Sequence, residues 1–299
     1  MPLPDSRIPT PLPAWYLAIT LAALAWGGAW FAAAEAGVQI ENSFTRFNRD
    51  RIESFRSHAS ATGARRVIVL GSSALKYATR DEQAFAAGIA GAANLPVEAL
   101  RISSNWGTFY EFAPLAADIR RASPDIVVME AEFLAADRPP ARRFLLWVED
   151  LRRQLGLDDQ AAEDDAKVQF GYPCWARKRQ DNHDKLLESR SDWVSVRPDG
   201  PGPRSTRRFA EELLDDGIEV AFVAIPRRPD YEVEASRTRM IAGDGESSRA
   251  LAGRVQRWQP EPLPAGLYCD LTHVTPAGQA RYSDWLESSI AQALSRPAP

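Results

Sequence analysis

The chain has 299 residues, of which 45% are apolar and 25% are charged, and its formal net charge is −4. Such a composition fits one globular domain together with an additional apolar segment. The net negative charge excludes a protein that follows nucleic-acid phosphates, because that function needs a concentrated basic surface. We therefore expect no nucleic-acid partner.

An apolar stretch with no charged side chain runs from Trp15 to Ala34. A helix of about 20 residues rises roughly 30 Å, which matches the hydrocarbon core of a bilayer. A cleaved signal peptide is the alternative, because the alanines at 32–34 resemble a cleavage site, but the apolar run is longer than a signal core. The segments that we predict before the main domain are a cytoplasmic tail over 1–13, a transmembrane anchor over 14–34 and a juxtamembrane linker over 35–64.

Strand and helix patterns alternate along the rest of the chain. Apolar and β-branched runs, which are typical of strands buried on both faces, predict strands over 65–70, 97–103, 126–131 and 218–225. Apolar spacing and capping residues predict helices over 74–92, 108–121, 141–155, 205–217 and 276–294. We interpret the irregular residues 138–202 as an insertion or lid within a domain over 65–296. The alternation indicates an α/β fold with a mainly parallel sheet.

A glycine and two serines, Gly71-Ser72-Ser73, follow the first predicted strand. Gly71 allows the backbone to turn sharply off the strand. A serine at the start of the next helix exposes its hydroxyl and its N–H at the positive end of the helix dipole. Ser73 can therefore supply both a nucleophile and an oxyanion donor, although either serine can also be a plain helix cap.

Asp270 stands three residues before His273 in the loop that leads to the last predicted helix. A serine hydroxyl needs a base to remove its proton, and that base needs an acid that fixes its tautomer. Of the three histidines, His58 lies in the juxtamembrane stretch and His183 in the polar middle segment. Only His273 combines a suitably spaced acid with a place at the expected edge of the sheet.

Asn105, Trp106 and Gly107 follow the second predicted strand. A glycine there exposes a backbone N–H that can act as a second oxyanion donor. A plain loop glycine is the alternative. The sequence contains neither a P-loop nor an acidic metal cluster of the usual spacing, so we expect no cofactor and no metal.

These three motifs together resemble those of the SGNH (GDSL-like) hydrolases, over about residues 65–294. In that family Gly-x-Ser follows the first strand, a glycine follows the second, and Asp-x-x-His precedes the last helix. The resemblance implies a three-layer α/β/α, flavodoxin-like fold. It also implies that Ser73 is the nucleophile, His273 the base and Asp270 its orienting acid, with oxyanion donors at Ser73 and Gly107.

Two positions depart from the family pattern. Ser72 replaces the aspartate of Gly-Asp-Ser, as it does in membrane-anchored members such as those of teichoic-acid D-alanylation. The Gly-x-Asn-Asp block after the third strand is absent, and Glu130 and Glu132 stand in that stretch. Loss of one oxyanion donor typically lowers the rate by about 10²–10³. The two glutamates are either structural or bind substrate, and the sequence does not choose.

An anchor ahead of such a domain is similar to the extracytoplasmic partners of membrane-bound O-acyltransferases that modify alginate, cellulose or teichoic acids. This similarity implies acyl, above all acetyl, transfer to or removal from an envelope or secreted polysaccharide. It implies a single-pass inner-membrane protein with a periplasmic domain, and an acyl donor supplied by the membrane partner. Asn105, Arg227 and Arg228 would then line a rim that binds the polymer. A solvated turn at the arginines is the alternative, and a non-catalytic scaffold of this fold is the competing function.

The chain contains two cysteines, Cys174 and Cys269. An even number of cysteines in an extracytoplasmic protein permits one disulfide, although spacing alone does not exclude two unpaired thiols. A bond between them would tie the middle segment to the loop that carries His273.

Overall fold

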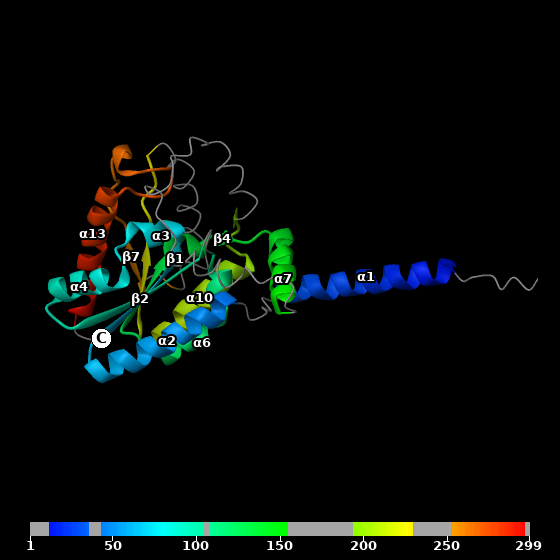
Figure 1. The fold of residues 1–299 in the computed structure, drawn as a ribbon, viewed down its shortest axis with the longest axis horizontal. Helices are drawn as coiled ribbons and strands as arrows, with labels where there is room; N and C mark the ends of the chain where they lie inside the picture. The colour runs from blue at the N-terminus through cyan, green and yellow to red at the C-terminus, as the bar shows by residue number, and fades with distance from the viewer. Residues whose placement is uncertain are drawn as a thin grey trace, which may run out of the picture.

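The computed structural model describes residues 12–35, 43–104, 108–154, 194–229, 251 and 253–296. These residues form a parallel sheet with helices on both faces, and a helix α1 (Leu12–Glu35) that extends away from this body (Figure 1). The predicted α/β class with a mainly parallel sheet is confirmed.

The main sheet has the strand order β2-β1-β3-β6-β7, and all neighbouring strands are parallel. Its strands are β1 (Arg65–Ser72), β2 (Val97–Ser104), β3 (Ile126–Glu130), β6 (Glu219–Val223) and β7 (Gln256–Trp258). This is the order of flavodoxin-like sheets, in which ligands bind outside the carboxyl ends of the strands. The edge strand β7 escaped prediction because its three residues are only partly covered and form no apolar run.

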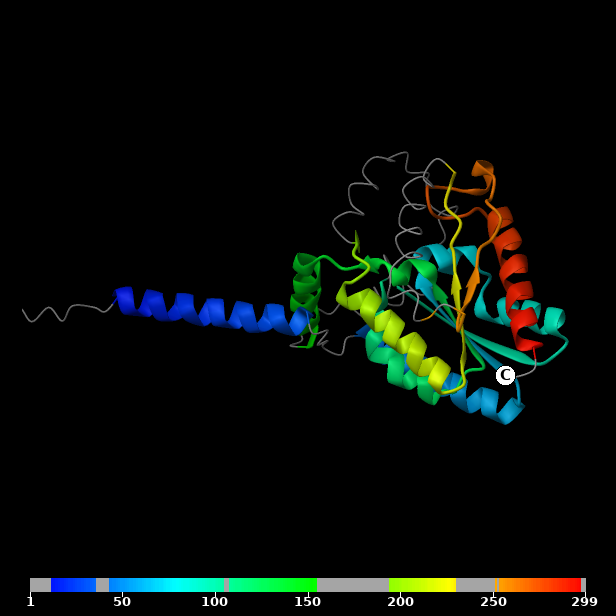
Figure 2. The same cartoon turned by 180° about the vertical axis from the view of Figure 1, so that it is seen from behind.

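Helices cover both faces of the sheet, as Figures 1 and 2 show from opposite sides. On one face lie α2 (Ser43–Thr62), α5 (Phe109–Phe112), α6 (Ala116–Arg121) and α10 (Pro201–Asp215). On the other face lie α3 (Ser73–Ala78), α4 (Glu82–Ala93) and α13 (Pro276–Leu294). Because side chains alternate along a strand, Ile68 and Leu70 of β1 enter the first core and Val67 and Val69 enter the second.

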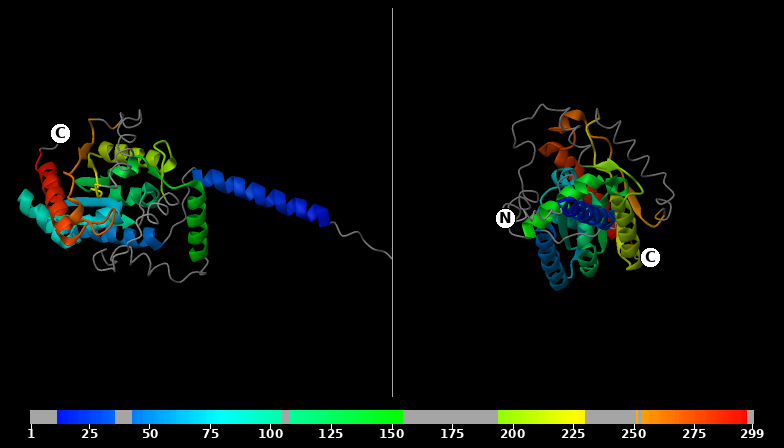
Figure 3. Two further views of the ribbon diagram at one scale, coloured as in Figure 1. Left: turned by 90° about the horizontal axis from the view of Figure 1, so that it is seen from above. Right: turned by 90° about the vertical axis from the view of Figure 1, so that its right-hand side faces the viewer.

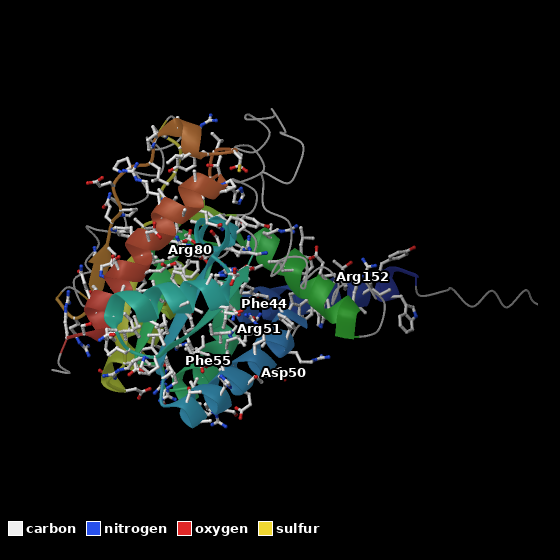
Figure 4. The ribbon with its side chains drawn as sticks, turned by 60° about the vertical axis from the view of Figure 1, so that its left-hand side comes forward. Phe44, Asp50, Arg51, Phe55, Arg80 and Arg152 are labelled. Carbon is white, nitrogen blue, oxygen red and sulfur yellow. The ribbon has the colours of Figure 1, made fainter. Side chains whose placement is uncertain are left out.

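Helix α2 belongs to the α/β body, whereas the sequence pattern assigned it to a linker. Its side chains Phe44, Ile52 and Phe55 are buried in the core beneath the sheet, and Asp50 on its outer side is exposed (Figure 4). Polar residues outnumber apolar ones in this helix, so the few buried aromatic positions did not stand out. The compact body therefore begins near Ser43.

The stretch predicted as one helix over 74–92 is two helices, α3 and α4, with a break at Thr79–Asp81. The Asp81 carboxylate accepts the N–H of Ala84 at 2.9 Å and so caps α4. Nη1 of Arg101, from β2, donates to carbonyl oxygens of Lys76, Thr79 and Arg80 at 2.6–3.1 Å. The guanidinium therefore supplies hydrogen-bond donors to carbonyl oxygens at the C-terminal end of α3.

The helix predicted over 108–121 is also divided, into α5, the 3₁₀ turn η1 (Ala113–Leu115) and α6. Pro114 lies in η1, and its missing N–H and bulky ring interrupt a regular α-helix. Two further 3₁₀ turns, η2 (Ala131–Leu134) and η4 (Ala265–Leu267), follow β3 and precede the loop of His273.

The structure describes part of the insertion predicted over 138–202. It contains α7 (Pro140–Gln154) and β5 (Ser195–Val196), which pairs antiparallel with β4 (Ala136–Asp137). Residues 155–193 lie outside the described residues. The view from above in Figure 3 shows α7 next to the inner end of α1, where the rings of Trp26 and Trp147 meet edge to face with centroids 6.0 Å apart.

Large apolar side chains of α1 are exposed, among them Trp15 and Leu24, each with 67% of its surface accessible. Within the part of the chain that the structure describes, no helix combines the length and the apolar character needed to cross a membrane.

Replacement of Arg101 by Met tests the hydrogen bonds at the C-terminal end of α3. The carbonyl oxygens would lose the Arg101 donor, although Thr79 also accepts from Nε2 of Gln279 at 2.9 Å and Lys76 from the Thr79 hydroxyl at 3.4 Å. Such a loss inside the protein typically costs about 1–3 kcal/mol. We expect the free energy of unfolding in urea to fall by this amount. Arg257 is exposed on β7, and Arg257→Met should change it by less than about 0.5 kcal/mol. Equal effects of both variants would contradict this role of Arg101.

Candidate active site

Ser73 is the first residue of α3, directly after β1. A Cβ at Gly71 would come 2.6 Å from Cβ of Leu75, so only glycine lets the helix fold back over the strand this closely. The hydroxyl of Ser72 accepts the N–H of Ala74 at 3.2 Å. Ser72 is thus the helix cap, and the hydroxyl of Ser73 is left for another partner.

That partner is His273. Its Nε2 lies 3.1 Å from Oγ of Ser73, although the residues are 200 positions apart. Its Nδ1 lies 2.6 Å from Oδ2 of Asp270. Because an ionised carboxylate only accepts hydrogen bonds, Nδ1 carries the proton and Nε2 is free to accept the proton of the serine. The structure therefore brings together Ser73, His273 and Asp270 in the geometry of a nucleophile, a base and an orienting acid.

The Asp270 carboxylate is fixed by its own loop. Oδ1 accepts the backbone N–H groups of Thr272 and His273, both at 2.7 Å. Burial alone would raise the pKa of Asp270, but the hydrogen bond from His273, the attraction between these two side chains and the two N–H donors lower it to about 2. The group is therefore ionised at neutral pH and stabilises a positive charge on the imidazole.

Backbone contacts hold the loop of His273 to the body. Tyr268 and Val274 form an antiparallel bridge, and the N–H of Cys269 donates to the carbonyl of His273 at 3.0 Å. Cys269 is also disulfide-bonded. The only other cysteine of the chain, Cys174, lies outside the described residues.

Tyr77 is a neighbour of the base that sequence reasoning missed. Its ring meets the imidazole of His273 edge to face, with centroids 5.2 Å apart. The sequence does indicate this position, because residues four apart on a helix share a face and Tyr77 follows Ser73 at that spacing. Its ring therefore restricts the orientation of the base.

Glu130 ends β3, next to the turn that carries the nucleophile. Its Oε2 accepts the N–H of Ser72 at 2.7 Å. Nη2 of Arg227 lies 2.7 Å from Oε1 of Glu132 and 3.5 Å from Oε1 of Glu130. Burial, followed by repulsion from Glu132, raises the pKa of Glu130 in spite of Arg227. Of the two roles left open for the glutamates, these contacts support the structural one.

The prediction that Arg227 lines a polymer-binding rim is wrong. Its side chain is 5% exposed and is ion-paired beneath the surface. The prolines on either side, Pro226 and Pro229, suggested a surface turn, and sequence alone offers no sign of the buried carboxylates. Arg228 is partly exposed, and its backbone N–H donates to the carbonyl of Leu271 at 3.1 Å.

Asn105 and Gly107 lie outside the described residues, as does His183. Ser104 of β2 stands in register with Ser72 of β1, so both strands end at the same edge of the sheet. Ser73 begins α3, and the first N–H groups of a helix have no acceptor within the helix.

Replacement of Asp270 by Asn tests the electrostatics of this loop. The pKa of Asp270 in the folded protein lies below its unfolded value of 3.8. Its contribution to stability is therefore present above pH 4 and is lost as the pH falls through about 2. We expect Asp270→Asn to lower the free energy of unfolding at pH 7 by about 2 kcal/mol, with the difference from wild type shrinking at acid pH. Asp50 is exposed on α2, and Asp50→Asn should change the free energy of unfolding at pH 7 by less than about 0.5 kcal/mol.

No protein-family model matches the chain, and no curated protein sequence matches it. Among solved structures, it is similar to a GDSL-like lipase from Bacteroides thetaiotaomicron, with 12% identity, a TM-score of 0.41 and coverage of 84% of this chain and 99% of the other. It is similar to a G-D-S-L family lipolytic protein from Desulfitobacterium hafniense, with 10% identity, a TM-score of 0.39 and coverage of 74% and 97%. An acylhydrolase-type protein from Bacteroides fragilis matches with 12% identity, a TM-score of 0.38 and coverage of 78% and 88%.

Proposed function

We propose that this protein is a serine-dependent enzyme that acts on acyl esters through an acyl-enzyme at Ser73. The observation that carries the proposal is the continuous contact from Oγ of Ser73 to Nε2 of His273, at 3.1 Å, and from Nδ1 to Asp270, at 2.6 Å. Such distances allow direct proton transfer between nucleophile and base.

In the first half of the reaction, Oγ of Ser73 attacks the acyl carbonyl carbon while Nε2 of His273 takes its proton. The carbonyl oxygen becomes an oxyanion that the N–H of Ser73 stabilises, and Asp270 stabilises the imidazolium. When the oxyanion collapses, the C–O bond to the leaving alcohol breaks, and that alcohol takes the proton from Nε2. Ser73 is left as an ester.

In the second half, His273 removes a proton from an incoming hydroxyl, which attacks the ester on Ser73 and regenerates the serine. Water as the acceptor gives an esterase, and a sugar hydroxyl gives an acyltransferase. We propose a sugar hydroxyl of an envelope or secreted polysaccharide, with acetyl as the acyl group, on the strength of the resemblance to the anchored partners of membrane-bound O-acyltransferases. Such a membrane partner would supply the acyl donor.

We also propose that α1 attaches the protein to the inner membrane and that the α/β body is periplasmic. Two features support this placement. The large apolar side chains exposed along α1 are typical of a surface that contacts an apolar partner. The disulfide at Cys269 is typical of proteins in oxidising compartments such as the periplasm.

A non-catalytic scaffold is the second candidate function. It is favoured by the stretch at the end of the third predicted strand, where Glu130 and Glu132 stand. The Gly-x-Asn-Asp block of the family, with its side-chain amide, is absent there. A carboxylate there repels an oxyanion rather than stabilising it, so the described site has one fewer donor than the family pattern. Covalent labelling separates this candidate from the enzyme.

We expect the full-length protein, in detergent, to react with a fluorophosphonate probe at Ser73, as peptide mass spectrometry would show. Ser73→Ala should abolish the adduct, and His273→Ala should slow it by at least about 10³, because the base is lost. Ser288→Ala, at an exposed serine on α13, is the matched control and should label like wild type. A folded wild-type protein that takes up no probe would favour the scaffold.

The acceptor is tested with p-nitrophenyl acetate as donor and soluble alginate or cellulose oligosaccharides as acceptors. We expect mass spectrometry to find an oligosaccharide that gains one acetyl group, and we expect no such product with Ser73→Ala. Release of acetate with no acetylated sugar would instead identify an esterase and remove the transferase proposal.

A further inference from the structure

A buried charged cluster lies next to the turn of Gly71, Ser72 and Ser73, which is called the nucleophile turn below. The cluster plays no part in the proton transfers described above. It consists of Glu130 at the end of β3, Glu132 in η2 and Arg227 in the segment after β6. Glu130 is 1% exposed and Arg227 is 5% exposed. Burying charges costs free energy even when they are paired, so the contacts that this cluster makes call for an explanation.

One end of the cluster holds the nucleophile turn. Oε2 of Glu130 accepts the N–H of Ser72 at 2.7 Å, which is the length of a charge-assisted hydrogen bond. Ser72 is bonded to Ser73 and also caps α3 through Ala74. The position of Glu130 therefore fixes the backbone from which the nucleophile projects.

The other end holds the loop of the base. Nη2 of Arg227 pairs with Glu132 at 2.7 Å and lies 3.5 Å from Glu130. The next residue, Arg228, donates its N–H to the carbonyl of Leu271 at 3.1 Å. Leu271 directly follows Asp270 in the sequence. The dipeptide Arg227-Arg228 thus contacts both the Glu130 carboxylate and the loop that carries His273.

We propose that Glu130 and Arg227 are positioning residues that set the separation of Ser73 and His273. The proposal rests on the function proposed for Ser73. In the family pattern an amide after the third strand contacts the oxyanion. In this chain the proposal gives the residues of that stretch the role of holding the backbone next to Ser73. The elements involved, β1, β3, the segment after β6 and the loop before α13, meet at the carboxyl edge of the sheet.

The charge of the cluster makes this role sensitive to pH. Glu130 interacts electrostatically with Glu132, Arg227 and Tyr282 of α13, and Tyr268 interacts electrostatically with Arg227 and Tyr282. The hydroxyl of Tyr282 donates to the carbonyl of Ala224 at 3.3 Å. Burial raises the pKa of Tyr282 well above its usual value, so the phenol stays neutral. Arg227 is the cation that opposes the rise in the pKa of Glu130. Without Arg227, Glu130 would take up a proton at a higher pH and would bind the N–H of Ser72 less strongly.

The first test replaces Glu130 by Gln, which keeps the shape and an acceptor oxygen but removes the charge. We expect kcat for p-nitrophenyl acetate to fall by about 10–10²-fold, since a displacement of about 1 Å can cost that much, with KM unchanged within about twofold. Asp118→Asn is the matched control, because Asp118 is also buried and paired with arginines, Arg49 and Arg121, but lies on α6 beneath the other face of the sheet. Equal effects on kcat in both variants would overturn the proposal.

The second test is the pH profile of kcat/KM. Arg227→Met should move the acidic limb to higher pH, and Arg227→Lys, which keeps the charge, should restore the wild-type limb. In the double variant Glu130→Gln/Arg227→Met the shift should disappear, because no carboxylate remains at that position to titrate. A general loss of packing would lower activity at every pH and would not move the limb. An unchanged profile in folded Arg227→Met would therefore count against the proposal.

Wild-type labelling separates the two hypotheses. If the wild-type protein takes up no fluorophosphonate at Ser73, the proposed function fails. If wild type is labelled and Glu130→Gln is labelled at the same rate, the function stands and only the positioning role fails.

Discussion

The register of β1 between its two neighbours is the constraint on which the site depends. β1 pairs in parallel with β2 on one side and with β3 on the other, and its interior residues are buried. Because all three strands run in the same direction, their carboxyl ends meet at one edge. The turn of Ser73 therefore lies beside the end of β3, where Glu130 reaches it, and the loop before α13 brings His273 to the same edge.

The parts of this arrangement that sequence could predict are those with a local signature. Apolar runs marked the central strands, and the Asp270–His273 spacing marked the base and its acid, because an Asp three residues before a His can fold back onto the ring within one turn of chain. The triad needed the added knowledge of which ends of the strands meet. The rule that functional groups gather at the carboxyl ends of parallel strands supplied that knowledge, and the distances between the side chains show that Ser73, His273 and Asp270 are in contact.

The parts that escaped prediction depend on contacts between distant segments. Arg227 looked like a surface residue between two prolines, yet its partners Glu130 and Glu132 lie about a hundred positions earlier. Helix α2 looked like a linker because its few buried aromatics are spread among polar residues. In both cases the local pattern describes a polar segment, and only packing against another element shows which side chains are inside.

The division of labour between the two serines has a consequence for how this motif varies. Ser72 caps α3 through its side chain, and aspartate is an equally good residue at a helix N-cap. An exchange between Gly-Ser-Ser and Gly-Asp-Ser therefore conserves the local fold and leaves the nucleophile untouched. The residue at position 72 therefore matters for the start of α3, and the hydroxyl of Ser73 does not depend on whether that residue is serine or aspartate.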